Sequence, residues 1–173
     1  FQQLKSAKRI VVATPECAWT LKHLYPRYGF DLEKKVVTLV EYLSPFLEAL
    51  PFTVKRKSPQ DYFYHDSCYQ GRYLNQFDGP RKLLELVLGF SPKEFSCHHE
   101  ESLCSGAGGP YAVIDPENSS LVTKKVLDEL AEKGGKTLVT ACPKALAKFK
   151  DVASPSSIVV KDLISFISEG LEE

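Results

Sequence analysis

The chain has 173 residues, of which 43% are hydrophobic and 25% are charged, so it is long enough for one globular domain with a buried core. Its 22 basic and 22 acidic residues give a formal net charge of zero, which argues against nucleic acid or an anionic membrane surface as the main partner. The sequence has no apolar run approaching the roughly eighteen residues of a membrane-spanning helix, and it shows no recognisable secretory leader.

The first third of the chain predicts a strand followed by two helices. Residues 8–14 form a β-branched run that ends at a proline, which indicates a buried strand entering a helix over 16–29. A second helix is predicted after Asp31, because apolar residues recur every three or four positions over 36–47. We expect Pro45 to kink or end this second helix.

The rest of the chain predicts strands that alternate with helices. In chain order we expect extended segments at 52–57 and 61–68, a helix at 79–89, a strand at 93–99, a helix capped by Asn118 or Ser119, a strand at 136–142, a short helix at 143–150, a strand at 156–162 and a terminal helix at 163–173. This order predicts an α/β fold with an open, mostly parallel sheet and helices on both faces.

The five cysteines carry the main chemical signal. Their odd number and wide spacing argue against a disulfide framework, which leaves metal binding, thiol chemistry or buried free cysteine. Cys68, Cys104 and Cys142 each lie at or after a predicted strand end, with 35 residues between the first two and 37 between the last two. Because the carboxyl ends of parallel strands meet at one edge of a sheet, we expect these three thiols to come together there.

Thiols at a sheet edge suit particular metals. Thiolates are soft ligands for iron–sulfur clusters and for zinc. Gly106, in the glycine-rich stretch after Cys104, is expected to let backbone N–H groups approach cluster sulfurs closely. A phosphate loop is disfavoured because the stretch at 102–111 lacks the G-x-x-x-x-G-K-[ST] pattern, and no thiol-protease signature surrounds any cysteine.

Other polar residues have simpler interpretations. The Cys-His-His run at 97–99 could supply zinc ligands, but adjacent strand residues point to opposite faces, so at most two could reach one metal. We expect His65 to be a strand-end residue hydrogen-bonded to backbone, and Arg72 to be a surface charge.

Two segments of the chain are alike. Residues 10–24 and 137–150 both contain a strand, then Thr or Cys, then a proline that enters a helix. Thr14 and Cys17 correspond to Cys142 and Ala145, so each segment is a C-x-x-C in which one cysteine is replaced. This likeness predicts an internal duplication with one complete copy and the end of another. Since the chain begins at Phe1 and contains no methionine, we expect a fragment or a processed product.

Three stretches in this order, HDSCYQGR, SLCSGAGG and VTACP, resemble the cysteine-rich "CCG" domain family. That family includes a subunit of heterodisulfide reductase and the iron–sulfur subunits of glycolate and lactate oxidases. By this resemblance, residues 1–57 are the end of a first repeat with a bridging helix, and residues 58–173 are one cysteine-rich (CCG) domain.

The resemblance also implies a cofactor, an iron–sulfur cluster of the [4Fe–4S] type. Its ligands here would be Cys68, Cys104 and Cys142, with Cys17 as the next candidate. Ser105 and Ala145 stand where the family has its other two cysteines. With three of five ligands present, we expect a labile cluster.

The function that this implies is an iron–sulfur electron-transfer subunit or domain of an oxidoreductase, rather than a complete enzyme alone. Expected partners are other redox subunits, carrying flavin or iron–sulfur groups, or a second copy of the chain, because an unpaired edge of the first strand favours association. We expect a cytoplasmic protein, either free or in a membrane-associated complex. The alternatives are an interaction module that keeps the fold without a cluster, and a zinc site in the same pocket.

Overall fold

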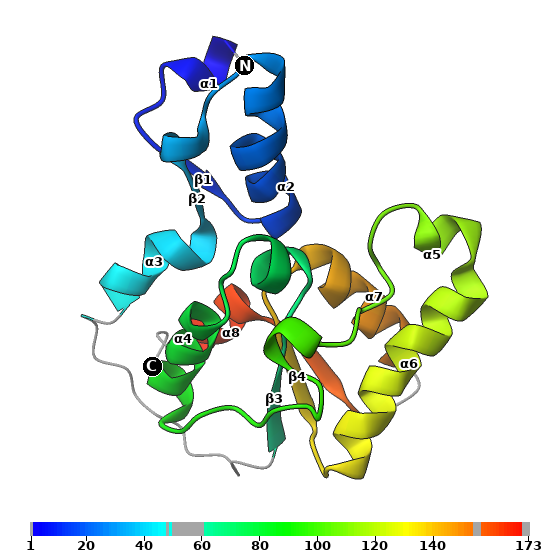
Figure 1. The fold of residues 1–173 in the computed structure, drawn as a ribbon. Helices are drawn as coiled ribbons and strands as arrows, with labels where there is room; N and C mark the ends of the chain where they lie inside the picture. The colour runs from blue at the N-terminus through cyan, green and yellow to red at the C-terminus, as the bar shows by residue number, and fades with distance from the viewer. Residues whose placement is uncertain (1, 48, 50–60, 154–156, 171–173) are drawn as a thin grey trace.

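The computed structural model describes residues 2–47, 49, 61–153 and 157–170, which form an α/β structure with two parallel sheets (Figure 1). The smaller sheet pairs β1 (Ile10–Val12) with β2 (Val36–Thr38). The larger sheet has the strand order β3–β4–β5, formed by Tyr62–His65, Thr137–Thr140 and Val159–Asp162. The predicted fold class is confirmed, with the strands divided between two sheets.

Helices connect the strands. In chain order they are α1 (Gln2–Lys5), α2 (Pro15–Trp19), α3 (Leu39–Leu47), α4 (Asp78–Leu88), α5 (Tyr111–Ile114), α6 (Pro116–Glu132), α7 (Pro143–Ala153) and α8 (Leu163–Glu169). Two π-helical turns, Thr20–Leu24 and Tyr69–Tyr73, and three 3-10 turns, Tyr25–Tyr28, Glu33–Lys35 and His99–Glu101, complete the described helical segments. Among the described residues, none of these helices is long and apolar enough to cross a membrane.

Helices cover both faces of the larger sheet because its side chains alternate along each strand. Tyr62, Tyr64 and Val139 pack on one face against residues of α4 and α8. Phe63 and Leu138 pack on the other face against residues of α6 and α7. Successive side chains of a strand point to opposite faces, so an apolar run such as YFYH fits a strand that is buried on both sides.

One strand was not predicted. The helix expected over 36–47 begins only at Leu39, because Val36–Thr38 forms β2 beside β1, with Ile10 opposite Val36. The three residues of β2 are all β-branched, and such side chains favour strands. Pro45 lies inside α3, which ends two residues later.

Two other local predictions were wrong. Residues 93–99 do not form a strand: only Lys93 makes a bridge, to Phe63, and a 3-10 turn begins at His99. The cap of α6 is Asp115, whose carboxylate accepts the N–H of Asn118 at 3.1 Å, with Pro116 at the first helical position. Proline pre-sets the helical φ, which explains why this helix begins earlier than expected.

The two similar segments have the same order of elements. β1 enters α2 at Pro15 and is followed by β2 and α3, while β4 enters α7 at Pro143 and is followed by β5 and α8. The internal duplication itself stays a prediction. The expected boundary between residues 57 and 58, and the extended segment expected at 52–57, lie outside the described residues.

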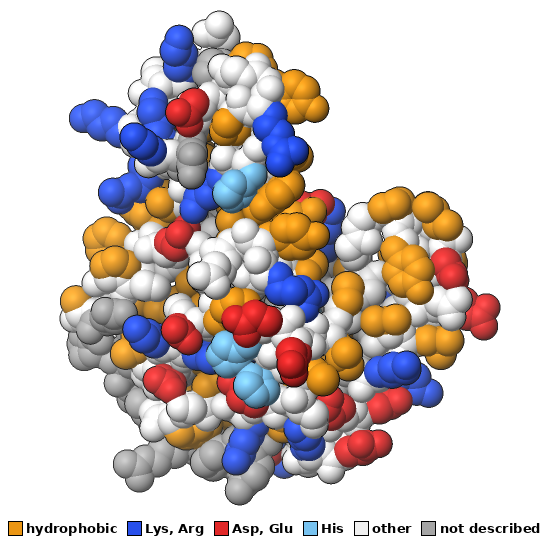
Figure 2. Space-filling model, viewed as in Figure 1, with side chains coloured by type: hydrophobic (Ala, Val, Ile, Leu, Met, Phe, Trp, Pro, Cys, Tyr) orange, Lys and Arg blue, Asp and Glu red, His pale blue; other side chains and the backbone are white. Residues whose placement is uncertain are grey.

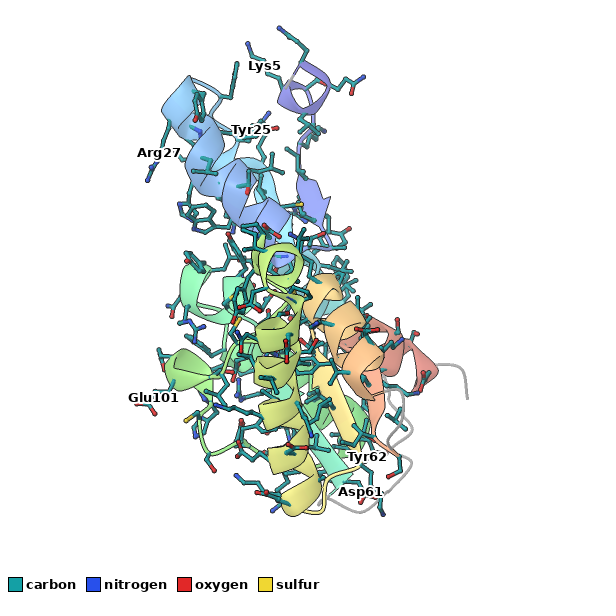
Figure 3. All side chains as sticks on the ribbon, turned by 90° about the vertical axis from the view of Figure 1, so that its right-hand side faces the viewer. Lys5, Tyr25, Arg27, Asp61, Tyr62 and Glu101 are labelled. Atoms are coloured by element: carbon teal, nitrogen blue, oxygen red, sulfur yellow. The ribbon has the colours of Figure 1, made fainter. Side chains whose placement is uncertain are left out.

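The larger sheet points its carboxyl edge at the N-terminal part. Figure 3 shows Asp61 and Tyr62, at the start of β3, far from Tyr25 and Arg27 of the N-terminal part. At the other end of β3, the ring of Tyr69 lies 5.9 Å from the ring of Trp19 in α2. The residues after β3 and β4 therefore lie between the two sheets.

Candidate functional site

Two of the candidate cysteines follow neighbouring strands. β3 and β4 are parallel partners, with His65 opposite Thr140 at their carboxyl ends. Cys68 comes three residues after β3 and is half-buried, and Cys142 comes two residues after β4 and is buried. This register brings the two residues to the same edge of the sheet, as the sequence predicted.

Cys104 reaches this edge on a loop that two side chains hold. The imidazole Nε2 of His65 lies 2.9 Å from the carbonyl oxygen of Leu103. Arg72 Nη1 donates to the carbonyl oxygens of Glu100, at 3.0 Å, and Ser102, at 2.8 Å. These contacts hold the stretch before Cys104 against the end of β3 and against the π-helical turn that follows it. Cys104 itself is exposed. The expectation that His65 bonds to backbone is confirmed, whereas Arg72 has a positioning contact that its sequence did not indicate.

The residues after Cys104 are fixed by α6. Ser119 Oγ donates to the carbonyl oxygen of Gly106 at 2.9 Å, and Thr123 Oγ1 donates to that of Ser105 at 2.7 Å. Gly106 has a φ of +79°, and a Cβ at this position would lie 2.4 Å from the carbonyl oxygen of Ser119. Only glycine fits here without displacement. The N–H of Gly106 lies 3.4 Å from Cys104 Sγ, which is the kind of backbone approach to sulfur that the glycine-rich stretch predicted.

Cys68 lies close enough to Cys104 and to Cys142 for each of them to influence its pKa. Burial raises the pKa of the Cys68 thiol, and the neighbouring Cys104 and Cys142 raise it further. Both effects disfavour the thiolate, because a second negative charge in a poorly solvated place is costly. A bound cation reverses this balance, so metal binding at these residues releases protons.

Unpaired polar atoms surround the same edge. Within the described part of the chain, four buried side-chain atoms lack a hydrogen-bond partner, namely Tyr64 Oη, His65 Nδ1, Ser67 Oγ and Thr140 Oγ1. Tyr64, His65 and Thr140 are in the last two residues of β3 or the last residue of β4, and Ser67 comes two residues after β3. Buried polar groups are almost always paired. Their concentration beside three thiols therefore fits a site that binds a further polar or metal-containing group.

Cys17 comes to this region from the other sheet. It lies in α2 and is exposed. Its neighbour Glu16 forms an ion pair with Lys144, which is two residues after Cys142. A cavity of about 310 Å³ lies between the two sheets and is lined by residues that follow their strands, among them Ala13, Gln70, Ala141 and Pro143.

The positions without cysteine are occupied by small buried side chains. Ala145 is 1% exposed and belongs to the core between the larger sheet and α7, and Ser105 is 8% exposed. Cys97 is half-buried. It lines a small pocket with His65, Leu103 and Val126 of α6.

An ion cluster near the site was missed entirely by sequence reasoning. Arg81 donates to both carboxylate oxygens of Asp66, at 2.8 and 2.7 Å, and to both of Glu94, at 2.7 and 2.9 Å. Burial alone would raise the pKa of Asp66, but the hydrogen bonds and charge of Arg81 hold it below its usual value. Asp66, Arg81 and Glu94 are far apart in the sequence, so they form no recognisable motif.

Comparisons with known proteins show what the chain resembles. A family model described as "CCG: Cysteine-rich domain" matches residues 62–150. The chain is 28% identical, over 98% of its length, to 42% of one subunit of the dihydromethanophenazine:CoB–CoM heterodisulfide reductase of Methanosarcina barkeri. It is 26% identical, over 83% of its length, to 20% of a probable iron–sulfur-binding oxidoreductase of Bacillus subtilis. It is also 33% identical, over 78% of its length, to 57% of lactate utilization protein A of Oceanobacillus iheyensis. The chain thus spans less than two thirds of each of these relatives.

Proposed function

Because this chain belongs to the cysteine-rich (CCG) domain family, we propose that it is the iron–sulfur part of a redox subunit, which passes electrons to or from a partner. Its relatives include named oxidoreductases and oxidoreductase subunits. The observation that carries the proposal is the meeting of Cys68, Cys104 and Cys142 at one sheet edge, where the latter two raise the pKa of the first.

The residues of the site have separate roles in this proposal. Cys68, Cys104 and Cys142 hold a cluster of the [4Fe–4S] type, and Cys17 is the next candidate ligand. Gly106 offers its N–H to sulfur. When bound, an iron–sulfur cluster supplies reversible one-electron transfer at a potential set by hydrogen bonds to its sulfurs and by solvent exposure. His65 holds the loop before Cys104 in place.

Three thiols leave part of a four-iron cluster without a protein sulfur. Ser105 and Ala145 occupy the positions where further thiolates would stand, and neither can replace one. We therefore propose a labile cluster that is lost in air. The exposure of Cys104 agrees with this, since it leaves the sulfur open to solvent.

We further propose the arrangement of the whole protein. Residues 1–57 are the end of a first repeat and residues 58–173 are the cysteine-rich domain. The partner is another redox subunit, carrying flavin or iron–sulfur groups, in a heterodisulfide reductase-like or glycolate oxidase-like complex, or else a second copy of the chain. The protein is cytoplasmic or part of a membrane-associated complex, and one relative is a probable membrane-anchored ferredoxin.

The test is anaerobic reconstitution of the reduced protein with ferrous iron and sulfide. Iron and sulfide per chain, and the broad visible absorption, are measured for the parent, Cys104→Ser and Cys97→Ser. Cys97 is the control because it is a half-buried thiol that is not one of the proposed ligands and follows neither β3 nor β4. We expect Cys104→Ser to lose most of the uptake and Cys97→Ser to retain it. If the parent binds no more iron than Cys104→Ser, the cluster proposal fails.

A second candidate function rests on the two missing ligand positions. The fold can serve as an interaction module without a cluster, or the same thiols can hold zinc, which three thiolates and one further ligand satisfy. Metal analysis of anaerobically purified protein distinguishes these cases. One zinc per chain in colourless protein supports the zinc site, and metal-free protein supports the module.

A further inference from the structure

A second group of metal-binding side chains consists of two histidines and Glu94, which also belongs to the ion cluster of Arg81. Glu94, His98 and His99 each place one ligand atom within 4.8 Å of the others. The Nδ1 atoms of His98 and His99 are 2.6 Å apart. Figure 2 shows a pair of histidine side chains side by side among acidic side chains on the larger part of the molecule. Two imidazoles and a carboxylate that converge in this way form half of a common coordination shell.

The charges around this group favour a cation. Arg81 is shared between Asp66 and Glu94, so two carboxylates face one guanidinium. With both acids ionised, this cluster has one negative charge in excess. Lys133 approaches the carbonyl oxygen of Glu94 at 3.3 Å, but its charge is paired with Glu129 at 3.0 Å. A divalent ion beside Glu94 would therefore meet a net negative environment.

The contacts of Arg81 do not prevent Glu94 from binding a metal. Each carboxylate oxygen has two lone pairs, and Arg81 uses one on each oxygen. The Asp66 carboxylate accepts the backbone N–H of His99 at 2.8 Å, which fixes the position of that residue. Ligands held by such outer hydrogen bonds are typical of protein metal sites.

The backbone around the two histidines is also unusual. His99 has a φ of +54°, the left-handed region that residues other than glycine adopt with strain. Its ring packs against Phe77, with centroids 5.4 Å apart, and lines a surface cavity of about 450 Å³. Since His98 is exposed, solvent has access to the group from outside. An ion held there keeps room for water ligands.

We propose that Glu94, His98 and His99 bind one divalent transition-metal ion, such as Zn²⁺, Ni²⁺ or Co²⁺. Imidazole and carboxylate donors suit these ions, whereas Mg²⁺ and Ca²⁺ prefer oxygen alone. Cys97 is not among the ligand atoms that converge there, and it lines a separate small pocket with Phe95 and Val126. This site is independent of the cluster proposed above.

A metal here would stabilise the loop that leads to the thiols. His99 is five residues before Cys104, and the intervening carbonyl oxygens of Glu100 and Ser102 already bond to Arg72. The ion would tie this loop to Glu94 and, through it, to Arg81 of α4. The role of the ion is structural. All three ligands belong to the short stretch 94–99, and one of them, Glu94, is paired with Arg81.

The test is anaerobic titration of the reduced protein with Co²⁺, followed by absorption spectroscopy. Cobalt bound by thiolate shows strong near-ultraviolet charge-transfer bands, while cobalt bound by imidazole and carboxylate shows weak visible bands alone. We expect two spectrally distinct sites in the parent. His98→Asn and His99→Asn should each weaken binding at the second site by at least about tenfold and leave the thiolate bands unchanged.

Controls separate ligand loss from misfolding. Asparagine tolerates the left-handed region better than most residues, so His99→Asn preserves the backbone at this position. The matched control is His23→Asn, since His23 is an exposed histidine in the π-helical turn Thr20–Leu24. Zn²⁺ should raise the thermal midpoint of the parent and of His23→Asn more than that of the His98→Asn, His99→Asn double variant. If that double variant binds as much Co²⁺ as the parent, or if all bound Co²⁺ shows thiolate bands, the proposal is wrong. Loss of the cluster in Cys104→Ser with this site intact shows that the two are separate.

Discussion

His65 and Leu103 are joined by a contact of 2.9 Å between imidazole Nε2 and carbonyl oxygen, although they are 38 positions apart in the chain. Burial lowers the pKa of His65 to about 4, so its ring is neutral near pH 7. Since a carbonyl oxygen only accepts hydrogen bonds, Nε2 carries the proton. The buried end of β3 thereby holds the loop that ends at Cys104.

The burial of His65 predicts a pH dependence of stability, because it lowers the pKa of the ring more than the contact with Leu103 raises it. In the unfolded chain His65 takes up a proton near pH 6.5, but in the folded protein it does so only near pH 4. The unfolded state therefore binds more protons between these values, and the free energy of unfolding falls as the pH is lowered through this window. The full effect of His65 is about 3 kcal/mol.

Urea unfolding at several pH values measures this slope. His65→Gln, which keeps a donor for Leu103, should lose most of the slope between pH 6.5 and 4, while His23→Gln should keep it. An equal slope in the parent and in His65→Gln would show that this histidine is not the group responsible.

The ion cluster of Arg81 predicts a large loss of stability. Arg81→Met leaves the Asp66 carboxylate, which is 4% exposed, without its cation. An uncompensated buried charge costs about 3–5 kcal/mol. The double change Arg81→Met, Asp66→Asn should recover much of this loss. Thermal or urea unfolding provides the measurement.

An exposed ion pair supplies the control. Lys161 and Glu169 are 2.6 Å apart but partly solvated, so Lys161→Met should cost less than about 1 kcal/mol. Similar losses in Lys161→Met and Arg81→Met would contradict the assigned role of burial.

The fold was predictable where one pattern dominated. The strands predicted at 136–142 and 156–162 each have a short core of β-branched and apolar residues, around which β4 forms at Thr137–Thr140 and β5 at Val159–Asp162. Residues 36–38 were misassigned, because apolar residues at helical spacing continue through them into α3 and hide a short strand. Polar and apolar side chains alternate over 94–97, which is typical of a strand. In the structure Glu94 instead accepts a hydrogen bond from Arg81, and a 3-10 turn begins at His99. Such long-range ion pairs have no local signature.

The candidate site shows the same division. Cys68 and Cys142 lie at one sheet edge because the parallel strands β3 and β4 end beside each other, as predicted. Cys104 was expected to follow a strand at 93–99, but that strand does not form and Cys104 lies on a loop instead. The groups that position the cysteines were not found, because Arg72 resembles any surface charge until its contacts with backbone carbonyls are known. The sequence therefore indicated the candidate thiols but not the Arg72 contacts that position the loop before Cys104.

The glycine at position 106 predicts a different kind of defect. Both Gly106, at a φ of +79°, and Gly109, at +58°, have left-handed backbones, but only Gly106 has a close neighbour for an added Cβ. Gly109→Ala should therefore cost about 1–2 kcal/mol from backbone strain alone. Gly106→Ala should cost about 1–3 kcal/mol more from the collision with Ser119.

Iron uptake should also be reduced more by Gly106→Ala than by Gly109→Ala. Gly106→Ala moves the N–H that approaches Cys104 Sγ, so reconstitution should yield less iron per chain than in the parent. Gly109→Ala should reconstitute normally. Equal stability and equal iron uptake in the two variants would mean that the packing of Gly106 on α6 contributes neither to stability nor to cluster binding.

The last prediction concerns the two positions where the family has cysteine and this chain does not. Ser105 exchanges its hydroxyl for a thiol of similar size, so Ser105→Cys should add a ligand beside Cys104 with little loss of stability. Ala145 is 1% exposed, and a sulfur there must be accommodated in the core at a cost of about 1–3 kcal/mol. We expect each change to increase iron and sulfide per chain and to lengthen the half-life of the visible absorption in air, with the largest effect in the double variant.

The control for this prediction is Ala153→Cys, which places a thiol at a buried position at the other end of α7, away from the strand ends. It should lower stability about as much as Ala145→Cys and leave cluster uptake at the parental level. If Ala145→Cys and Ala153→Cys have the same iron content and the same half-life in air, position 145 does not face the thiols, and the ligand set carried over from the family is wrong for this chain.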